Sequence, residues 1–194
     1  MSNIRTSGID LYHNDSPVQF GQAKANGAQF AICKASQGVG MIDPMYQAYR
    51  AQAKAAAILF GAYMFFDPAA DPIQQARHFI NAATPAKGDL VPALDVETPG
   101  DNVGANAHAC AEEIKDLTGY WPILYSGDSF YQENLKAHFT ECPLWIARYG
   151  HAPVTTCEIW QFTDASREPG TSHQLDGNVY FGTIEDLIAK HTIK

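Results

Sequence analysis

The sequence predicts an α/β fold, an irregular (β/α) barrel of the TIM type in which the late helices are shortened or missing. Short apolar runs alternate with amphipathic segments along the 194 residues, a pattern typical of parallel strands joined by right-handed helical crossovers. Eight runs have the character of strands, the number that closes such a barrel, although the chain allows only about 24 residues for each unit. An open, doubly wound sheet is the alternative, but no glycine-rich phosphate-binding loop follows a predicted strand.

The predicted strands are short and rich in Ile, Val, Phe, Tyr and Trp, as expected for strands buried on both faces. They are Gly8–Tyr12, Gln29–Ala35, Leu59–Phe66, Leu90–Val96, Pro122–Tyr125, Pro143–Ala147, Glu158–Phe162 and, with a weaker pattern, Gln174–Phe181. The last three lie so close together that no full helix fits between them, and we expect loops there.

Three helices of the first half begin with a recognisable signal, an N-cap residue followed by proline at the first helical position. The signals are Ser16-Pro17, Asp43-Pro44 and Asp71-Pro72, and they predict helices over Pro17–Asn26, Pro44–Ala57 and Pro72–Ala83. Gly27 is well placed to stop the first of these helices. Amphipathic spacing predicts three more, over Asn106–Leu117, Ser129–Ala137 and Ile184–Lys190.

Charge and hydropathy exclude several classes of partner. The 21 acidic and 13 basic side chains give a formal charge of −8, whereas a nucleic-acid-binding surface needs an excess of lysine and arginine. No apolar run approaches the roughly 18 residues that a membrane-spanning helix needs. The sequence therefore predicts a single domain over residues 1–194, a monomer with no nucleic-acid partner and no membrane insertion.

Neither the cysteines nor the histidines have metal-binding spacing. The four cysteines form no CxxC pair and no cysteine–histidine cluster, and no HxH or HExxH motif is present. We expect free thiols, no metal and no cofactor, with His13 and His173 as solvated loop residues rather than ligands.

The sharpest candidate site is the segment Val91–Glu97 (VPALDVE). Residues two apart on a strand face the same side, so Asp95 and Glu97 project together, away from Leu94 and Val96. Repulsion between two carboxylates on an apolar strand raises the proton affinity of one, as a general acid near neutral pH requires. The alternative is that these carboxylates cap a helix or pair with a lysine, and a lone D-x-E motif favours that alternative.

Two further acidic residues favour the catalytic interpretation of the D-x-E pair over the structural one. Functional side chains of parallel α/β folds collect at the carboxyl ends of the strands, where Asp10 and Asp176 are expected. The first and last strands adjoin in a closed barrel, so these two acids can face the D-x-E pair across one pocket. Aromatic residues end several of the same strands, and carboxylates with aromatic platforms suit a neutral sugar ring. The residues therefore predict a carbohydrate site.

Seven motifs follow one another from about Gly8 to Leu187, nearly the whole chain. They are GID (8–10), FAICKA (30–35), GAY (61–63), ALDVE (93–97), LWIARY (144–149), IWQF (159–162) and DGNVYFG (176–182). Each is weak alone, but the ordered set resembles glycoside hydrolase family 25, the Chalaropsis-type lysozymes or N-acetylmuramidases.

The resemblance implies hydrolysis of the β-1,4 bond between N-acetylmuramic acid and N-acetylglucosamine in peptidoglycan, on an irregular barrel. Glu97 matches the family's proton donor. Asp95 matches the second carboxylate, which either orients the substrate's 2-acetamido group as nucleophile or acts more directly at the anomeric carbon; we favour the first role. Asp10 and Asp176 match acids that line the pocket. The residues implied to contact sugar are Tyr63, Tyr125, Trp145, Tyr149 and Gln161.

Three positions depart from the family pattern. Gln37 stands where many members have an acidic residue, Met64 where many have a histidine, and residues 12–15 (YHND) replace a more usual Ser-His-Trp-Gln-Gly. We expect Gln37 to contact substrate and to alter the electrostatics of the pocket, its pH optimum or its substrate preference.

Other functions stay open on the sequence. A metal-dependent peptidoglycan or polysaccharide hydrolase or deacetylase would lose activity in EDTA, and a non-catalytic peptidoglycan-binding barrel would release no reducing ends. A chitinase-like glycosidase is closer in chemistry, but only the final D-x-E of its longer acidic motif is present.

The route to the substrate is a separate expectation. The N-terminus lacks the apolar segment of a signal peptide. We expect synthesis in the cytoplasm and action on the cell wall after lysis or signal-independent export, as for a phage endolysin or a secreted effector. An export machine, a holin or an immunity protein would then be a partner.

Overall fold

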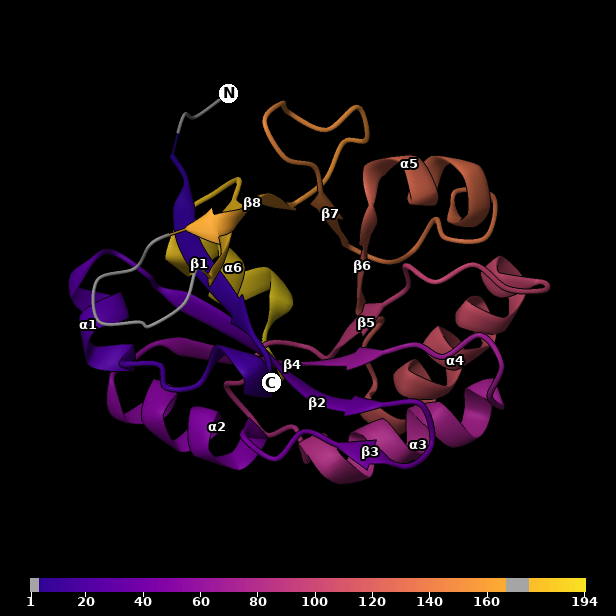
Figure 1. The fold of residues 1–194 in the computed structure, drawn as a ribbon, viewed down its shortest axis with the longest axis horizontal. Helices are drawn as coiled ribbons and strands as arrows, with labels where there is room; N and C mark the ends of the chain where they lie inside the picture. Colours follow the sequence, from indigo (N-terminus) through magenta and orange to yellow (C-terminus); the bar gives the residue numbers. More distant parts are fainter. Residues whose placement is uncertain (1–3, 167–174) are drawn as a thin grey trace.

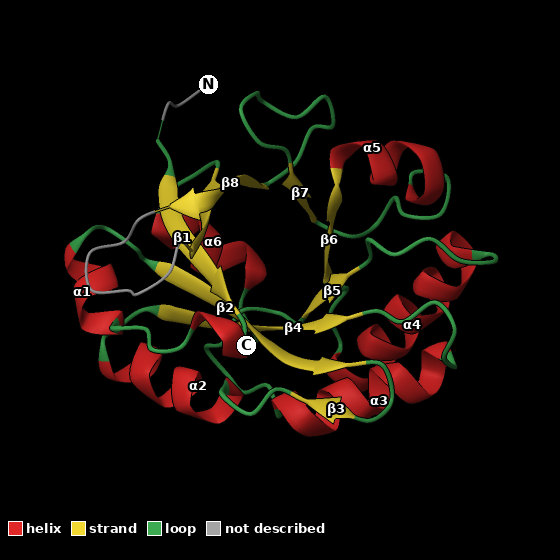
Figure 2. Cartoon of the chain, viewed as in Figure 1, coloured by secondary structure: helices red, strands yellow, loops and turns green. Residues whose placement is uncertain are grey.

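The computed structural model describes residues 4–166 and 175–194, which form a barrel of strands with helices on its outside (Figures 1 and 2). The elements are β1 (Thr6–Leu11), α1 (Phe20–Ala25), β2 (Phe30–Gln37), β3 (Met41–Ile42), α2 (Tyr46–Ala55), β4 (Leu59–Phe65), α3 (Pro72–Ala83), β5 (Ala93–Asp95), α4 (Val103–Thr118), β6 (Ile123–Gly127), α5 (Asp128–Phe130), β7 (Leu144–Ala147), β8 (Ile159–Ser166), β9 (Leu175–Tyr180) and α6 (Ile184–His191). A 3-10 turn (His13–Asp15) follows β1, and a π-helical turn (Tyr131–Leu135) continues α5.

The described strands confirm the predicted barrel. Eight of them close it in the order β1–β2–β4–β5–β6–β7–β8–β9, with β9 returning to β1, while the short β3 pairs with the end of β2 outside the barrel. One expectation was wrong: β9 runs antiparallel to both of its neighbours. Only eight residues (167–174) separate β8 from β9, too few for the crossover that a parallel strand needs.

Helices cover the first half of the barrel and loops cover much of the second. In Figure 1, α2, α3 and α4 follow one another around the outside of β2, β4 and β5. Residues 148–158, between β7 and β8, are loop throughout. The predicted shortage of late helices is therefore confirmed.

The helix-start signals had mixed outcomes. Asp71 caps α3 as predicted, accepting a hydrogen bond from the Gln74 N–H at 2.8 Å, with Pro72 as the first helical residue. The first helix begins at Phe20 rather than at Pro17, and residues 16–19 lie outside any helix. The second begins at Tyr46 rather than at Pro44.

Two of the helix ends follow the sequence closely, and one helix changes type. Gly27 follows the end of α1 with a φ of +104°, and Gly119 ends α4 with a φ of +83°, both in the left-handed region that glycine adopts without strain. The helix predicted over Ser129–Ala137 begins at Asp128 and passes into the π-helical turn.

The alternation of side chains along each strand builds the barrel interior. Phe30, Ile32, Ile123 and Ile159 point inward and form the interior cluster, whereas the residues between them pack against the helices. Gly8 belongs to this interior, because a Cβ there would collide with the ring of Phe30.

On four of these strands, the next inward-pointing side chain toward the carboxyl end is polar. Two residues after Gly8, Ile32, Ala93 and Ile159 come Asp10, Lys34, Asp95 and Gln161, all buried. The pocket is therefore the upper continuation of the barrel interior, at the carboxyl ends of β1, β2, β5 and β8.

The opposite end of the barrel is closed by the C-terminal segment. Leu187 of α6 is fully buried in the interior cluster, and Thr192 pairs with Leu90, which precedes β5. Within residues 4–166 and 175–194, no helix combines the length and the apolar character needed to cross a bilayer.

Candidate active site

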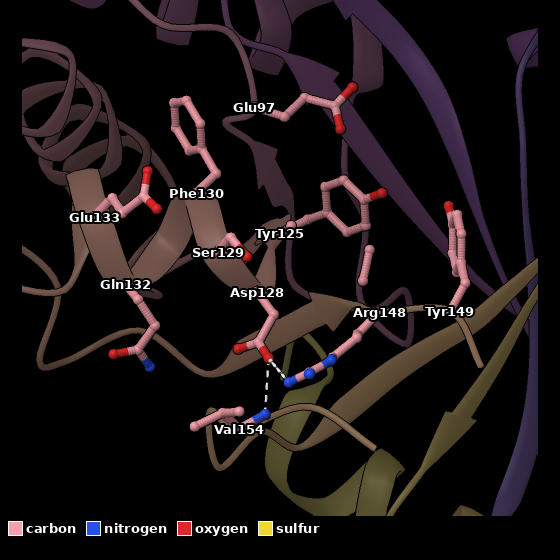
Figure 3. Close-up of a pocket in the computed structure, with 12 residues that line it drawn as sticks. Glu97, Tyr125, Asp128, Ser129, Phe130, Gln132, Glu133, Arg148, Tyr149 and Val154 are labelled. Carbon is pink, nitrogen blue, oxygen red and sulfur yellow. Dashed lines mark hydrogen bonds and ion pairs between the residues drawn. The ribbon is translucent and has the colours of Figure 1, made fainter. Parts of the chain in front are cut away.

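Two adjoining cavities open at the carboxyl ends of the parallel strands. The smaller, of about 230 Å³, is lined by Asp10, Tyr12, Lys34, Tyr63, Phe65, Asp95, Glu97, Tyr125, Trp145 and Asp176. The larger, of about 700 Å³, lies between α5 with its continuation and the 147–154 segment (Figure 3). Glu97 and Tyr125 line both cavities and so mark the boundary between them.

The D-x-E segment is held rigidly at the end of β5. The Phe66 N–H donates to the carbonyl of Asp95 at 2.8 Å, and the Val96 N–H donates to the carbonyl of Tyr125 at 3.0 Å. The buried hydroxyl of Ser126 donates to the carbonyl of Val96, also at 2.8 Å. These bonds fix the backbone on both sides of Val96, so that both acids face the smaller cavity as the strand periodicity predicts.

The two acids of this segment differ in their surroundings. Asp95 is 5% exposed, and within the described residues its Oδ1 has no hydrogen-bond partner, whereas Glu97 is exposed at the cavity boundary. Burial, followed by repulsion from Glu97, raises the pKa of Asp95 well above its usual range. Burial also raises the pKa of Glu97, and attraction to Lys34 opposes the rise at both acids. Both carboxyl groups therefore favour the protonated form more than a carboxyl group in water does.

Asp10 and Asp176 meet on neighbouring strands. They lie opposite each other in the antiparallel register of β1 and β9, and their carboxyl groups share a hydrogen bond. Burial raises the pKa of Asp10 well above its usual range and that of Asp176 to about 6. Asp176 begins β9 rather than ending a strand, but the reversed direction of β9 brings it to the predicted end of the barrel.

A buried amide network supports these acids from behind. Gln161 Nε2 donates to Asp10 Oδ2 at 2.9 Å, and Gln161 Oε1 accepts from the hydroxyls of Tyr125 and Tyr149, both at 2.9 Å. Asn178 Nδ2 donates to the same Asp10 oxygen at 2.6 Å. Gln161 is only 1% exposed and lines neither cavity, so in this structure its contacts are with Asp10, Tyr125 and Tyr149.

The expected aromatic residues divide between the two cavities. Tyr63 and Trp145 line the smaller one, Tyr149 lines the larger one, and Tyr125 lines both. The Trp145 and Tyr125 rings meet edge to face, with centroids 4.5 Å apart, and Trp145 Nε1 donates to Asn178 Oδ1 at 2.7 Å. The aromatic wall is thus locked by ring packing and by hydrogen bonds.

Gln37 lies beside the site rather than in its lining. Its side chain is exposed, and its Oε1 accepts a hydrogen bond of 2.8 Å from the ammonium of Lys34. Lys34, which sequence reasoning did not select, lines the smaller cavity. A lysine inside the apolar run FAICKA was the available signal, since lysine is seldom buried without a partner.

A second missed residue, Asp128, builds the larger cavity. Its two carboxylate oxygens accept hydrogen bonds from Arg148 (2.9 Å), from the Val154 N–H (2.7 Å), and from the N–H (3.1 Å) and hydroxyl (2.6 Å) of Thr155. These bonds tie the 148–155 loop to the start of α5. Figure 3 shows the result, with Phe130 and Glu133 on one side of the cavity and Tyr149 on the other.

Other predicted features fall outside both cavities. His13 Nδ1 lies 2.9 Å from the buried Asp43 Oδ2, and His173 is outside the described residues. Met64 is buried against Cys110 between the barrel and the helices, so its departure from the family pattern does not change the pocket. Among residues 4–166 and 175–194, no three His, Cys, Asp or Glu side chains are grouped to hold a metal ion.

Four carboxyl groups and an aromatic wall at the carboxyl end of a (β/α) barrel define the class of barrel glycoside hydrolases. The chain belongs to the glycosyl hydrolases family 25, whose family model matches residues 9–171.

Relatives and a solved structure agree with this placement. An N,O-diacetylmuramidase from Chalaropsis is 30% identical over 199 residues, covering 89% of this chain and 94% of that protein. The uncharacterized protein YegX of Escherichia coli K12 is 32% identical over 169 residues; the match covers 83% of this chain but only 62% of YegX. A family 25 glycosyl hydrolase from Bacillus anthracis has the same fold, with a TM-score of 0.90, 22% identity and coverage of 99% and 96% of the two chains.

Proposed function

We propose that this protein is an N-acetylmuramidase, a lysozyme that acts as a monomer on peptidoglycan glycan strands. The bond it hydrolyses is the β-1,4 bond between N-acetylmuramic acid and N-acetylglucosamine. Family membership and the similarity to an N,O-diacetylmuramidase support the reaction class. The observation that carries the proposal is the position of Glu97, which lines both cavities while Asp95 lines only the smaller one.

This position sets the orientation of the substrate. A general acid must reach the oxygen between the sugar that reacts and the sugar that leaves. With Glu97 at the boundary, the N-acetylmuramic acid ring occupies the smaller cavity and the leaving N-acetylglucosamine occupies the larger one. The larger cavity has about three times the volume of the smaller, so it accommodates more of the glycan strand.

The side chains then supply the steps of a substrate-assisted hydrolysis. Glu97, whose pKa is raised, donates its proton to the glycosidic oxygen as the bond to the anomeric carbon breaks. Asp95, which lines the smaller cavity, accepts the N–H of the 2-acetamido group, and the acetamido oxygen bonds to the anomeric carbon. Glu97, now ionised, takes a proton from the water that opens this intermediate.

The test is digestion of purified peptidoglycan by the wild type and by Glu97→Gln, with mass spectrometry of the products. We expect new reducing N-acetylmuramic acid ends from the wild type and no turbidity clearing by the variant, whose circular dichroism should match the wild type. Clearing by Glu97→Gln at the wild-type rate would overturn the assignment. The anomer formed at early times reports whether configuration is retained.

Two further measurements separate the alternative functions. A metal-dependent hydrolase or deacetylase would lose activity on incubation with EDTA, whereas we expect the rate to be unchanged. A non-catalytic binding protein would sediment with peptidoglycan yet release no reducing ends at any enzyme concentration.

A further inference from the structure

Lys34 has no part in the steps above, although it lines the smaller cavity. Among the described side chains that line this cavity it is the one basic group, and it shares the cavity with Asp10, Asp95, Glu97 and Asp176. It is only 8% exposed. A buried ammonium among carboxyl groups is not screened by water as a surface lysine is, so its charge acts strongly on its neighbours.

Its position is fixed by two contacts. Lys34 Nζ donates to Gln37 Oε1 at 2.8 Å and lies 4.8 Å from the centre of the Phe65 ring, within the range of a cation–π interaction. Both partners are uncharged. The ammonium is therefore anchored without being neutralised, and a carboxylate at position 37 would instead form an ion pair with it.

We propose that Lys34 is a positioning residue whose ammonium, anchored by the neutral Gln37, holds one negative charge on the pair formed by Asp95 and Glu97. The proposal rests on the proposed function. The proposal also gives a role to Gln37, which stands where many members of the family have an acidic residue. Because Gln37 is neutral, it does not cancel the positive charge of Lys34, which then acts fully on Asp95 and Glu97.

The electrostatics around Lys34 agree with this role. Attraction to Lys34 lowers the pKa of both Asp95 and Glu97 against the rise caused by burial. Burial lowers the pKa of Lys34 itself, and Asp95, Asp43 and Glu97 oppose that change.

The remaining titratable groups around the smaller cavity come from four strands and the residues that follow them. They are Asp10 and Tyr12 on and after β1, Tyr63 on β4, Tyr125 on β6 and Asp176 on β9. None of them carries a positive charge, so Lys34 is the group whose removal changes the balance.

The first test compares the pH dependence of kcat for the wild type, Lys34→Met and Lys34→Arg. Removing the positive charge makes both carboxylates easier to protonate. In Lys34→Met both limbs of the pH profile of kcat, the acidic and the basic, should therefore move to higher pH by about one unit. At the wild-type acidic midpoint this is roughly a fivefold loss of kcat with little change in KM. Lys34→Arg should restore the wild-type limbs, and Lys24→Met, which removes an exposed lysine, serves as the control.

Gln37→Glu tests the second half of the proposal, because an acid that pairs with Lys34 should move the limbs in the same direction by a smaller amount. If kcat of Lys34→Met falls equally at every pH with unmoved limbs, or if Lys34→Arg does not restore them, Lys34 has a merely structural role and the proposal is overturned.

A measurement without turnover separates this proposal from the proposed function. Carboxyl carbon NMR follows the titration of Asp95 and Glu97 in the folded wild type and in Lys34→Met. A rise of both pKa values in the variant supports the proposal even if no muramidase activity is found. Unchanged titrations refute it even if the enzyme is active.

Discussion

Asp10 on β1 and Asp176 on β9 are direct cross-strand partners, and the two carboxyl groups share a hydrogen bond at the edge of the smaller cavity. Like charges opposite each other in a sheet destabilise the pairing. The molecule tolerates this arrangement because Asn178 and Gln161 both donate to Asp10 Oδ2. The cost of the pair depends on pH, which makes it measurable.

Asp176→Asn should stabilise the protein at neutral pH. The folded-state pKa of Asp176 is about 6, above its usual 3.8, so the folded protein binds more protons between these values and loses stability as the pH rises through them. The full shift corresponds to roughly 3 kcal/mol, and solvent screening of this partly buried side chain reduces the expected gain to about 1 kcal/mol. Denaturant unfolding at several pH values checks it: the gain should be absent below about pH 4. Equal destabilisation at every pH would contradict this explanation.

Asp95→Asn should separate stability from activity. The wild-type carboxyl group is buried with one unpartnered oxygen, so removing its charge should raise the free energy of unfolding at neutral pH. At the same time kcat on peptidoglycan should fall by about a hundredfold, because the group that orients the acetamido nitrogen is lost. Thermal unfolding and turbidity assays on the same preparation measure both effects. A variant that is less stable and fully active would contradict both roles.

Gln161→Met should lower both stability and kcat without altering the lining of either cavity. The substitution leaves the hydroxyls of Tyr125 and Tyr149 and one oxygen of Asp10 without their shared partner. We expect a loss of about 2 kcal/mol in the free energy of unfolding. The exposed Gln52→Met on α2 is the matched control and should leave both quantities unchanged. If only KM rises, then Gln161 contacts substrate, as the family resemblance implied.

Asp128→Asn should loosen the wall of the larger cavity. The amide nitrogen of asparagine replaces one accepting oxygen with a donor, either Oδ2, which accepts from Arg148 and the Val154 N–H, or Oδ1, which accepts from Thr155. The loop should lose about 1–3 kcal/mol of local stability, seen as faster hydrogen exchange at Val154 and Thr155. If the leaving part of the glycan lies in this cavity, KM for long glycan strands should rise more than KM for short oligosaccharides. Equal effects on both substrates would contradict that orientation.

Local rules of chain geometry account for what could be predicted. Runs of apolar residues located the strands, and the Asp71-Pro72 signal located α3, because both depend on neighbouring residues only. The side-by-side position of Asp95 and Glu97 follows from the two-residue repeat of a strand in the same way. The Ser16-Pro17 signal predicted a helix start at Pro17, but the helix begins three residues later, at Phe20.

The sequence by itself determined the barrel, its shortage of late helices and the acids at one end of it. Only the tertiary structure decided the direction of β9, the place of Gln161 behind the site and the use of Asp128 as a clamp. It also paired Lys34 with Gln37 and aimed the ammonium into the acid pocket. The reason is the separation along the chain: Asp10 is bonded to Asn178 across 168 positions and to Gln161 across 151, and no local pattern encodes such contacts.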